Sequence, residues 1–203
     1  AGIALDTLEA DANVILTAAG NTAITNDAAL ALQGAVTGTL AATASAGGIT
    51  DSSNLSASGN VTLNDVATAG ITLDTLEADA NVILTAAGNT AITNDAALAL
   101  QGAVTGTLAA TATTGGITDS SNLSASGDVT LNDVATAGIT LDTLEADANV
   151  IITAAGNTAI TNDAALALQG AVTGTLAATA SAGGITDSSN LSATGNVTLN
   201  DVA

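Results

Sequence analysis

Short apolar runs separated by turn residues recur along the whole chain. Residues 61–63 read Val-Thr-Leu, residues 82–84 read Val-Ile-Leu and residues 129–131 again read Val-Thr-Leu. Glycine-containing pairs such as Gly88-Asn89 and Gly115-Gly116 stand between such runs. Short β-branched runs between turn residues are typical of β-strands joined by tight turns. The pattern therefore predicts an all-β protein made of many short strands.

Apolar residues fall into three repeating sets, called the first, second and third ranks in chain order, and each rank recurs about every 22 residues. The leucine of the third rank always precedes the next valine of the first rank by six residues, as Leu76 precedes Val82. We interpret the three ranks as three strands, and therefore three faces, in each coil of the chain. The first rank begins at Val61, Val82, Val104 and Val129, the second holds Ile71, Ile92 and Ile117, and the third holds Leu76, Leu98 and Leu123.

Coils of this length stack naturally as a parallel β-solenoid with about nine coils. In that arrangement the second-rank isoleucines lie above one another in a thin aliphatic core, and the threonine that follows each of them points outward. A helical interpretation of residues 73–81 and 95–102, which contain Ala, Leu, Glu and Gln, is the alternative. Thr, Ile, Val and Gly interrupt every helical pattern within ten residues, which favours strands.

A 68-residue unit is written three times, at residues 1–68, 69–136 and 137–203. The copies differ only by conservative changes at six positions, such as Leu16, Leu84 and Ile152. We therefore expect one continuous solenoid over residues 1–203. An array of interchangeable units presents a surface that repeats along an axis, whereas an ordinary substrate pocket is unique.

Composition removes most chemistry from consideration. The chain has no Lys, Arg, His, Cys, Met, Pro, Phe, Tyr or Trp, and its formal net charge is -19. Without basic side chains nothing neutralises phosphate, so we expect neither nucleic acid nor an anionic membrane surface as a partner. Thiol nucleophiles, disulfides and the common zinc sites are excluded. The apolar runs are too short to span a bilayer, so we expect no membrane insertion.

Acidic residues are the best candidates for a functional site. Asp74, Glu77 and Asp79 lie within six residues, and Asp95 and Asp119 follow the second-rank isoleucines of the next coils. Stacked carboxylates repel one another, so the sequence predicts either a solvated acidic face with no cofactor or a calcium site. The equivalent residues in the other copies are Asp6, Glu9, Asp11, Asp27, Asp51, Asp142, Glu145, Asp147, Asp163 and Asp187.

Threonines that follow the isoleucines form a second repeated feature. We expect them on one exposed rank, which would suit an ice-binding surface, although Thr is also a common outward residue of any β-sheet. The rank contains Thr25, Thr50, Thr72, Thr93, Thr118, Thr140, Thr161 and Thr186.

Residues 47–63 read Gly-Gly-Ile-Thr-Asp-Ser-Ser-Asn-Leu-Ser-Ala-Ser-Gly-Asn-Val-Thr-Leu. This style resembles the repeats of filamentous-haemagglutinin-type bacterial adhesins. The resemblance implies a right-handed parallel β-helix in a secreted or cell-surface stalk. The chain has neither the secretion domain nor a cap of that family, so we expect a piece of a longer array or a unit that assembles end to end.

The sequence therefore predicts a structural shaft of an extracellular fibre or adhesin, with copies of itself as partners, end to end or side by side. An ice-binding or calcium-dependent surface-adhering solenoid is the alternative. We expect no enzyme, because β-helices that degrade polysaccharides add aromatic platforms and basic groups to their carboxylates. A pair such as Asp74 and Glu77 lacks both.

Overall fold

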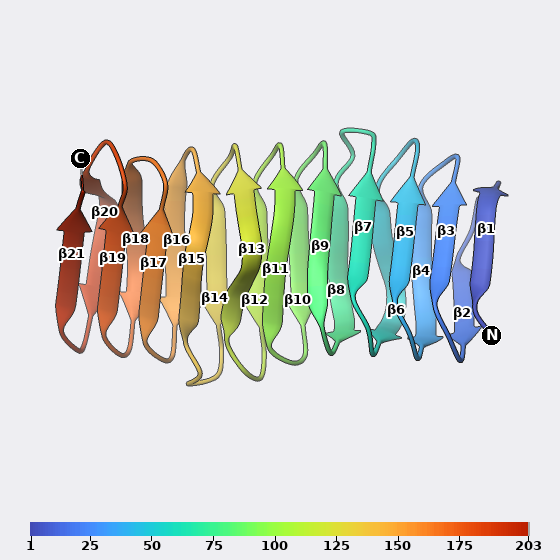
Figure 1. The fold of residues 1–203 in the computed structure, drawn as a ribbon, viewed down its shortest axis with the longest axis horizontal. Helices are drawn as coiled ribbons and strands as arrows, with labels where there is room; N and C mark the ends of the chain where they lie inside the picture. The colour runs from blue at the N-terminus through green and yellow to red at the C-terminus, as the bar shows by residue number, and fades with distance from the viewer. Residues whose placement is uncertain (203) are drawn as a thin grey trace.

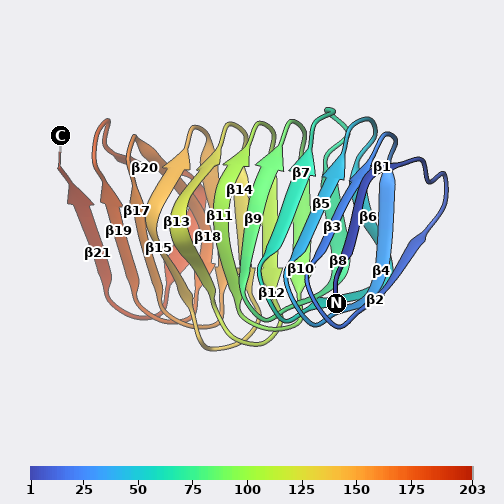
Figure 2. The ribbon, with the colours of Figure 1, turned by 45° about the vertical axis from the view of Figure 1, so that its right-hand side comes forward.

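Twenty-one strands and no helix make up residues 1–202, the part of the chain that this computed structural model describes (Figure 1). The odd-numbered strands form an 11-stranded sheet and the even-numbered strands a 10-stranded sheet, named here the odd sheet and the even sheet. All neighbours within a sheet are parallel, and the two sheets run in opposite directions. Figure 2 shows them joined by short loops at both edges. The predicted all-β parallel β-solenoid is confirmed.

The odd sheet contains β1 (Ile3–Leu8), β3 (Thr22–Asn26), β5 (Leu40–Ala44), β7 (Val61–Asp65), β9 (Asn81–Ala86), β11 (Leu98–Val104), β13 (Ile117–Ala125), β15 (Ile139–Ala146), β17 (Thr158–Asn162), β19 (Leu176–Ala180) and β21 (Val197–Asp201). The even sheet contains β2 (Val14–Ala18), β4 (Leu30–Val36), β6 (Ile49–Ala57), β8 (Ile71–Ala78), β10 (Thr90–Asn94), β12 (Leu108–Ala112), β14 (Val129–Asp133), β16 (Asn149–Ala154), β18 (Leu166–Val172) and β20 (Ile185–Ala193).

Each coil has two strands, not the three that the sequence predicted. The three ranks do not mark three successive strands throughout, since Ile71 and Leu76 both lie in β8 and Ile117 and Leu123 both lie in β13. Each turn reverses the chain, so β11 returns to pair with β9. A coil therefore closes after about 19 residues, close to the expected 22, and the chain makes about ten coils. Residues 73–81 and 95–102 form strands and turns, not helices.

Two predicted ranks are divided between the sheets. Ile117 lies in β13 of the odd sheet, whereas Ile71 and Ile92 lie in the even sheet. Ile92 pairs with Leu73, so even these two isoleucines do not stack. The threonines are also divided, and Thr25 and Thr50 already belong to different sheets. The single rank expected for an ice-binding face is therefore not formed.

The core is a narrow aliphatic layer between the two sheets. Inward side chains alternate with outward ones, and Val61, Leu63, Val82 and Leu84 are fully buried in the odd sheet. Burying a side chain of this size contributes about 1.5–3 kcal/mol. Gly102 interrupts this column because its φ of 108° favours glycine, and a Cβ there would lie 2.0 Å from the carbonyl oxygen of Leu84.

Each 68-residue repeat contains seven strands, or three and a half coils. Because seven is odd, equivalent strands of successive repeats lie in opposite sheets: β1 is in the odd sheet, β8 in the even sheet and β15 in the odd sheet again. The wider loops that follow β7 and β14 accordingly lie on opposite edges of the rod (Figure 1). Successive repeats are thus related by a half-turn about the long axis and a shift along it.

Candidate functional site

Three equivalent shallow grooves lie on the outer faces of the solenoid. The first and third grooves open on the odd sheet, and the second opens on the even sheet. Their volumes are about 280 Å³ for the first groove, 240 Å³ for the second and 200 Å³ for the third. The first is lined by Asp6, Thr7, Leu8, Glu9, Thr25, Asp27 and Ser45, the second by Asn54, Asp74, Thr75, Leu76, Glu77, Thr93, Asp95 and Thr113, and the third by Asn122, Asp142, Thr143, Leu144, Glu145, Thr161, Asp163 and Ser181.

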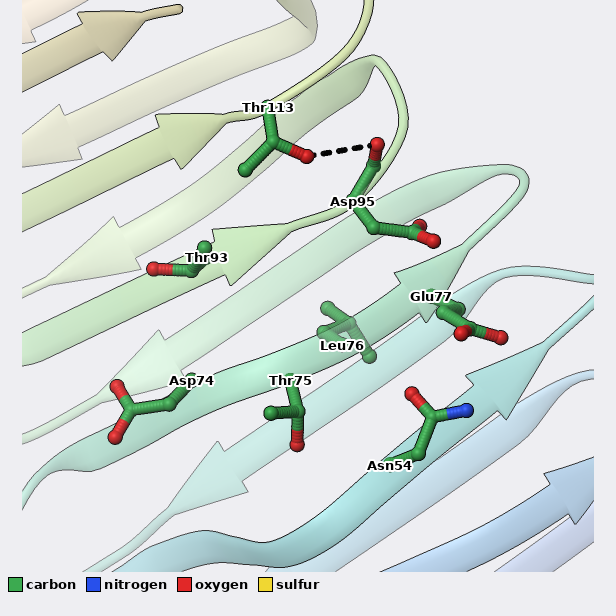
Figure 3. Close-up of a pocket in the computed structure, with 8 residues that line it drawn as sticks. All are labelled: Asn54, Asp74, Thr75, Leu76, Glu77, Thr93, Asp95 and Thr113. Carbon is green, nitrogen blue, oxygen red and sulfur yellow. Dashed lines mark hydrogen bonds between the residues drawn. The ribbon is translucent and has the colours of Figure 1, made fainter.

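A bulge in β8 shapes the second groove. Asp74 and Thr75 are consecutive residues, yet both side chains are exposed, whereas Leu76 is fully buried. The register shifts on both sides of this point, against β10 and against β6. An extra residue in one strand leaves backbone groups outside the ladder. Figure 3 shows the polar side chains on the outer face and Leu76 behind the strand.

The carboxylate of Asp51 accepts hydrogen bonds from the backbone N–H groups that the bulge leaves outside the ladder. Its Oδ1 accepts the N–H of Asp74 at 2.9 Å, and its Oδ2 accepts the N–H of Thr75 at 2.6 Å and the Thr75 hydroxyl at 2.9 Å. Asp119 makes the same three contacts with the next repeat, to Asp142 and Thr143. Hydrogen bonds to a carboxylate are strong, so this aspartate acts as a clamp between successive repeats.

The five residues singled out in the sequence do not form one column. Asp74, Glu77 and Asp95 line the second groove, and Asp79 lies in the turn that follows β8. Asp119 lies in β13 of the odd sheet, on the opposite face. The aspartate beside Asp74 is Asp51, which belongs to the preceding repeat. Stacking was predicted from a three-strand coil, and the two-strand coil places Asp119 on the face opposite to Asp74 and Asp95.

Carboxylates in the groove are spread out rather than gathered. Among residues 1–202, no group of three Asp or Glu side chains is placed so that it could hold a metal ion. Threonine hydroxyls stand between the acids, and the hydroxyl of Thr113 donates to the carbonyl oxygen of Asp95 at 2.9 Å (Figure 3). The geometry fits a hydrated acidic surface, and the calcium site stays a prediction.

Sequence reasoning missed two buried acids, Asp65 and Asp133. Each is 1 % exposed and ends a strand in the inward position. The Oδ2 of Asp65 accepts the N–H of Gly70 at 2.7 Å and so closes the wide loop after β7. Burial raises the pKa of both carboxyls, against the lowering effect of backbone hydrogen bonds such as that from Gly70. The period-two pattern Val61, Leu63, Asp65 was the available signal.

Buried asparagines close another set of corners. Oδ1 of Asn94 accepts the N–H of Ala78 at 2.8 Å, while its Nδ2 donates to the carbonyl oxygens of Ala78 at 3.1 Å and Ala97 at 2.8 Å. Asn26 and Asn162 make the same contacts in the other repeats. These residues hold the framework of the groove and lie outside its surface.

The repeating unit is also what comparison with protein families detects. The model of a family described as repeats of unknown function, DUF5649, matches residues 19–87, 87–154 and 155–203. The chain belongs to the DUF5649 family. The first two DUF5649 matches contain seven strands each, β3 to β9 and β10 to β16, in agreement with the three and a half coils of the repeat.

No curated protein and no solved structure matches this DUF5649 chain. Residues 1–202 contain no helix that could span a membrane.

Proposed function

We propose that this chain is a structural shaft of an extracellular or cell-surface fibre. The observation that carries the proposal is the unbroken strand order of both sheets along the whole rod. Backbone hydrogen bonds between neighbouring strands run along the long axis, so every coil is joined to the next by a ladder of bonds. Twenty-one strands at two per coil make ten and a half coils, or about 50 Å.

The outer surface supports a passive role. Many outward side chains are small or polar, as in β10 with Ala91 and Thr93 and in β12 with Ala109 and Thr111, although an isoleucine is outward in β2, β9 and β16. No side chain is basic or aromatic, and the net charge is -19. Like-charged rods repel one another and repel nucleic acid, which favours a spacer that does not adhere to its surroundings.

The grooves favour a structural role over catalysis or adhesion. They are shallow, occur three times and alternate between faces. Enzymes bind substrates in deeper sites that surround most of the ligand. The ice-binding alternative lost its main support when the threonine rank proved to be divided between the sheets.

An outer location rests on the resemblance of residues 47–63 to repeats of filamentous-haemagglutinin-type adhesins. Such repeats build stalks outside the cell. Antibody labelling of intact cells that make the protein tests this part of the proposal. Labelling that requires permeabilised cells would contradict it.

Rod length provides the test of the shaft itself. A variant with a fourth identical repeat adds seven strands, and we expect it to be longer by about 17 Å with an unchanged cross-section. Small-angle X-ray scattering of the three-repeat and four-repeat chains gives both quantities. An increase in cross-section without the increase in length would contradict the shaft.

A further inference from the structure

Between β3 and β18, the acids on the two outer faces are confined to bands. On the even sheet, β6 and β8 carry Asp51, Asp74 and Glu77 outside the core. The next five strands of this sheet, β10, β12, β14, β16 and β18, contain one acid, the buried Asp133. Their outward side chains are those of Ala, Thr, Asn, Ile and Gln. We name β6 with β8 the acidic band and the five strands the uncharged panel of the even sheet.

The odd sheet has the same two features at other heights along the rod. Its acidic band is β13 with β15, which carry Asp119, Asp142 and Glu145. Its uncharged panel is β3, β5, β7, β9 and β11, whose one acid is the buried Asp65. Successive repeats are related by a half-turn, so the acidic band of one sheet lies behind the uncharged panel of the other, as β8 lies behind β7 and β9 (Figure 1).

An outward isoleucine lies behind each of two grooves. Ile83 of β9 and Ile151 of β16 are the large aliphatic side chains on the outer faces of the panels. Since β9 directly follows β8, Ile83 lies at the height of the second groove, which contains Leu76, but on the opposite face of the rod. Ile151 has the same relation to the third groove, which contains Leu144. At these heights the rod is recessed on one face and carries an aliphatic side chain on the other.

We propose that copies of this chain associate side by side, with the odd sheet of one copy against the even sheet of the next. The copies are parallel and are not shifted along the long axis. Ile83 of one copy then packs over the second groove of its neighbour, and each acidic band faces an uncharged panel. The facing bands are separated by three and a half coils, about 17 Å along the axis.

Charge makes a copy of this chain a suitable partner in this alignment. Each copy carries a formal charge of -19. Salt at physiological ionic strength screens charges over about 8 Å, so bands about 17 Å apart repel each other weakly. A shift of three and a half coils would bring band against band, and like charges placed together across an interface are costly. The bands therefore select the alignment, and the panels provide the contact.

The area of the faces is sufficient for a stable contact. A five-residue strand is about 17 Å long, and the three and a half coils of a repeat are about 17 Å high, so a repeat covers about 280 Å² of each face. Two copies that face each other over three repeats cover about 1,700 Å² in total, which is the size of a standard protein–protein interface.

Cysteine pairs test the alignment, since the chain has no cysteine of its own. Thr72 of β8 and Thr85 of β9 are both exposed, and each is the second residue of its strand from the same edge of the rod. They point to opposite faces, so Thr85 of one copy faces Thr72 of the next. We expect Thr72→Cys with Thr85→Cys, treated with a short bifunctional maleimide at physiological salt, to give a ladder of covalent oligomers on a denaturing gel.

Three controls accompany this pair. Each single variant, Thr72→Cys or Thr85→Cys, has no cysteine to meet when unlike sheets face each other. The pair Thr72→Cys with Glu145→Cys tests the height, because Glu145 lies in the outward column of Thr85 but three strands further along the odd sheet. We expect all three controls to remain monomeric on the gel. A ladder in any control, or none in the test pair, would overturn the proposal.

A pair of charge variants tests the uncharged panel. Thr85→Glu adds a carboxylate opposite the acidic band of the neighbour, and we expect the association constant at physiological salt to fall about tenfold or more. Thr140→Glu adds the same charge to the same sheet, at an exposed position that faces the neighbour's uncharged panel, and leaves association nearly unchanged. Sedimentation velocity measures both constants. Equal weakening in the two variants would count against the proposed interface.

This inference rests on the proposed shaft for its biological purpose, because rods joined side by side are stiffer than one rod. The two fail separately. Electron microscopy that shows single rods of about 50 Å, together with no cross-linked ladder, keeps the shaft and removes the side-by-side association. Compact particles without rod shape would remove the shaft itself.

Discussion

Asn94 and Asp133 occupy similar positions at the ends of strands but differ in how completely their side chains are hydrogen-bonded. Each is the last inward residue of a five-residue strand of the even sheet, and each is almost completely buried. Asn94 makes three hydrogen bonds with Ala78 and Ala97. Asp133 binds the N–H of Gly138 at 2.8 Å through Oδ2, while its Oδ1 has no partner among the described residues.

This difference shows that the hydrogen-bond donors and acceptors of a buried side chain must match those of the loop beside it. An amide both donates and accepts, so Asn94 can bridge a carbonyl and an N–H of the coil below and a carbonyl of its own short loop. A carboxylate only accepts, and Asp133 turns toward the N–H groups of a longer loop. The side chain of Asn94 makes all of these hydrogen bonds and does not titrate, whereas burial raises the pKa of the Asp133 carboxyl.

The most damaging exchange is Asn94→Asp. It places a carboxylate against the carbonyl oxygens of Ala78 and Ala97, which now receive no hydrogen bond. We expect a loss of about 4 kcal/mol in the free energy of unfolding at pH 7. Urea unfolding followed by circular dichroism measures it. Part of the loss returns at pH 4, where a protonated carboxyl can donate; a loss that does not depend on pH would contradict this account.

Truncation of the same side chain has a somewhat smaller effect. Asn94→Ala removes three hydrogen bonds and leaves buried backbone groups of Ala78 unpaired, so we expect a loss of about 3 kcal/mol. Asn132→Ala, on the outward face of β14, is the control, with an expected loss below about 0.5 kcal/mol. Urea midpoints that fall equally in both variants would show that the corner bonds do not matter.

The acidic corners give the chain an unusual pH dependence. Burial raises the folded-state pKa of Asp65 and Asp133 above the ordinary 3.8, so the native state binds protons more tightly than the unfolded chain. The free energy of unfolding therefore increases as pH falls from neutral toward 3.8, and it gains nothing further from these two groups below that. Urea midpoints between pH 7 and pH 4 measure this rise.

Replacing both acids isolates their share. Asp65→Asn with Asp133→Asn removes the buried charge and keeps an acceptor for Gly70 and Gly138, so we expect a gain on the order of 1 kcal/mol at pH 7 and a flatter pH profile. The pair Asp79→Asn with Asp147→Asn makes the same chemical change in exposed turns. If that control flattens the profile equally, general charge repulsion explains the pH dependence.

The smallest effect separates specific calcium binding from screening. Because the groove acids are spread out, we expect millimolar calcium and sodium at the same ionic strength to raise the melting temperature equally. Circular dichroism melts of one sample in both salts make the comparison. A rise with calcium alone would support the calcium site predicted from Asp74, Glu77 and their neighbours.

Sequence reasoning located strands better than it assigned them to faces. Val61, Val82 and Leu98 do lie in the apolar runs of successive odd strands, and the turns do contain the expected glycines. The error came from the number of strands in a coil. Three ranks of apolar residues look alike whether a turn bends the chain by a third or reverses it, because both arrangements bury every second residue.

The sequence by itself determined the solenoid, the repeat and the acidic, aromatic-free surface, because periodicity and composition are local properties of the chain. Only the tertiary structure decided that a coil has two strands, that successive repeats face opposite ways, and that Asp51 lies beside Asp74. Those facts depend on how sharply each turn bends and on which strand returns to pair with which. Contacts between residues about twenty positions apart settle both, and no short stretch of sequence contains them.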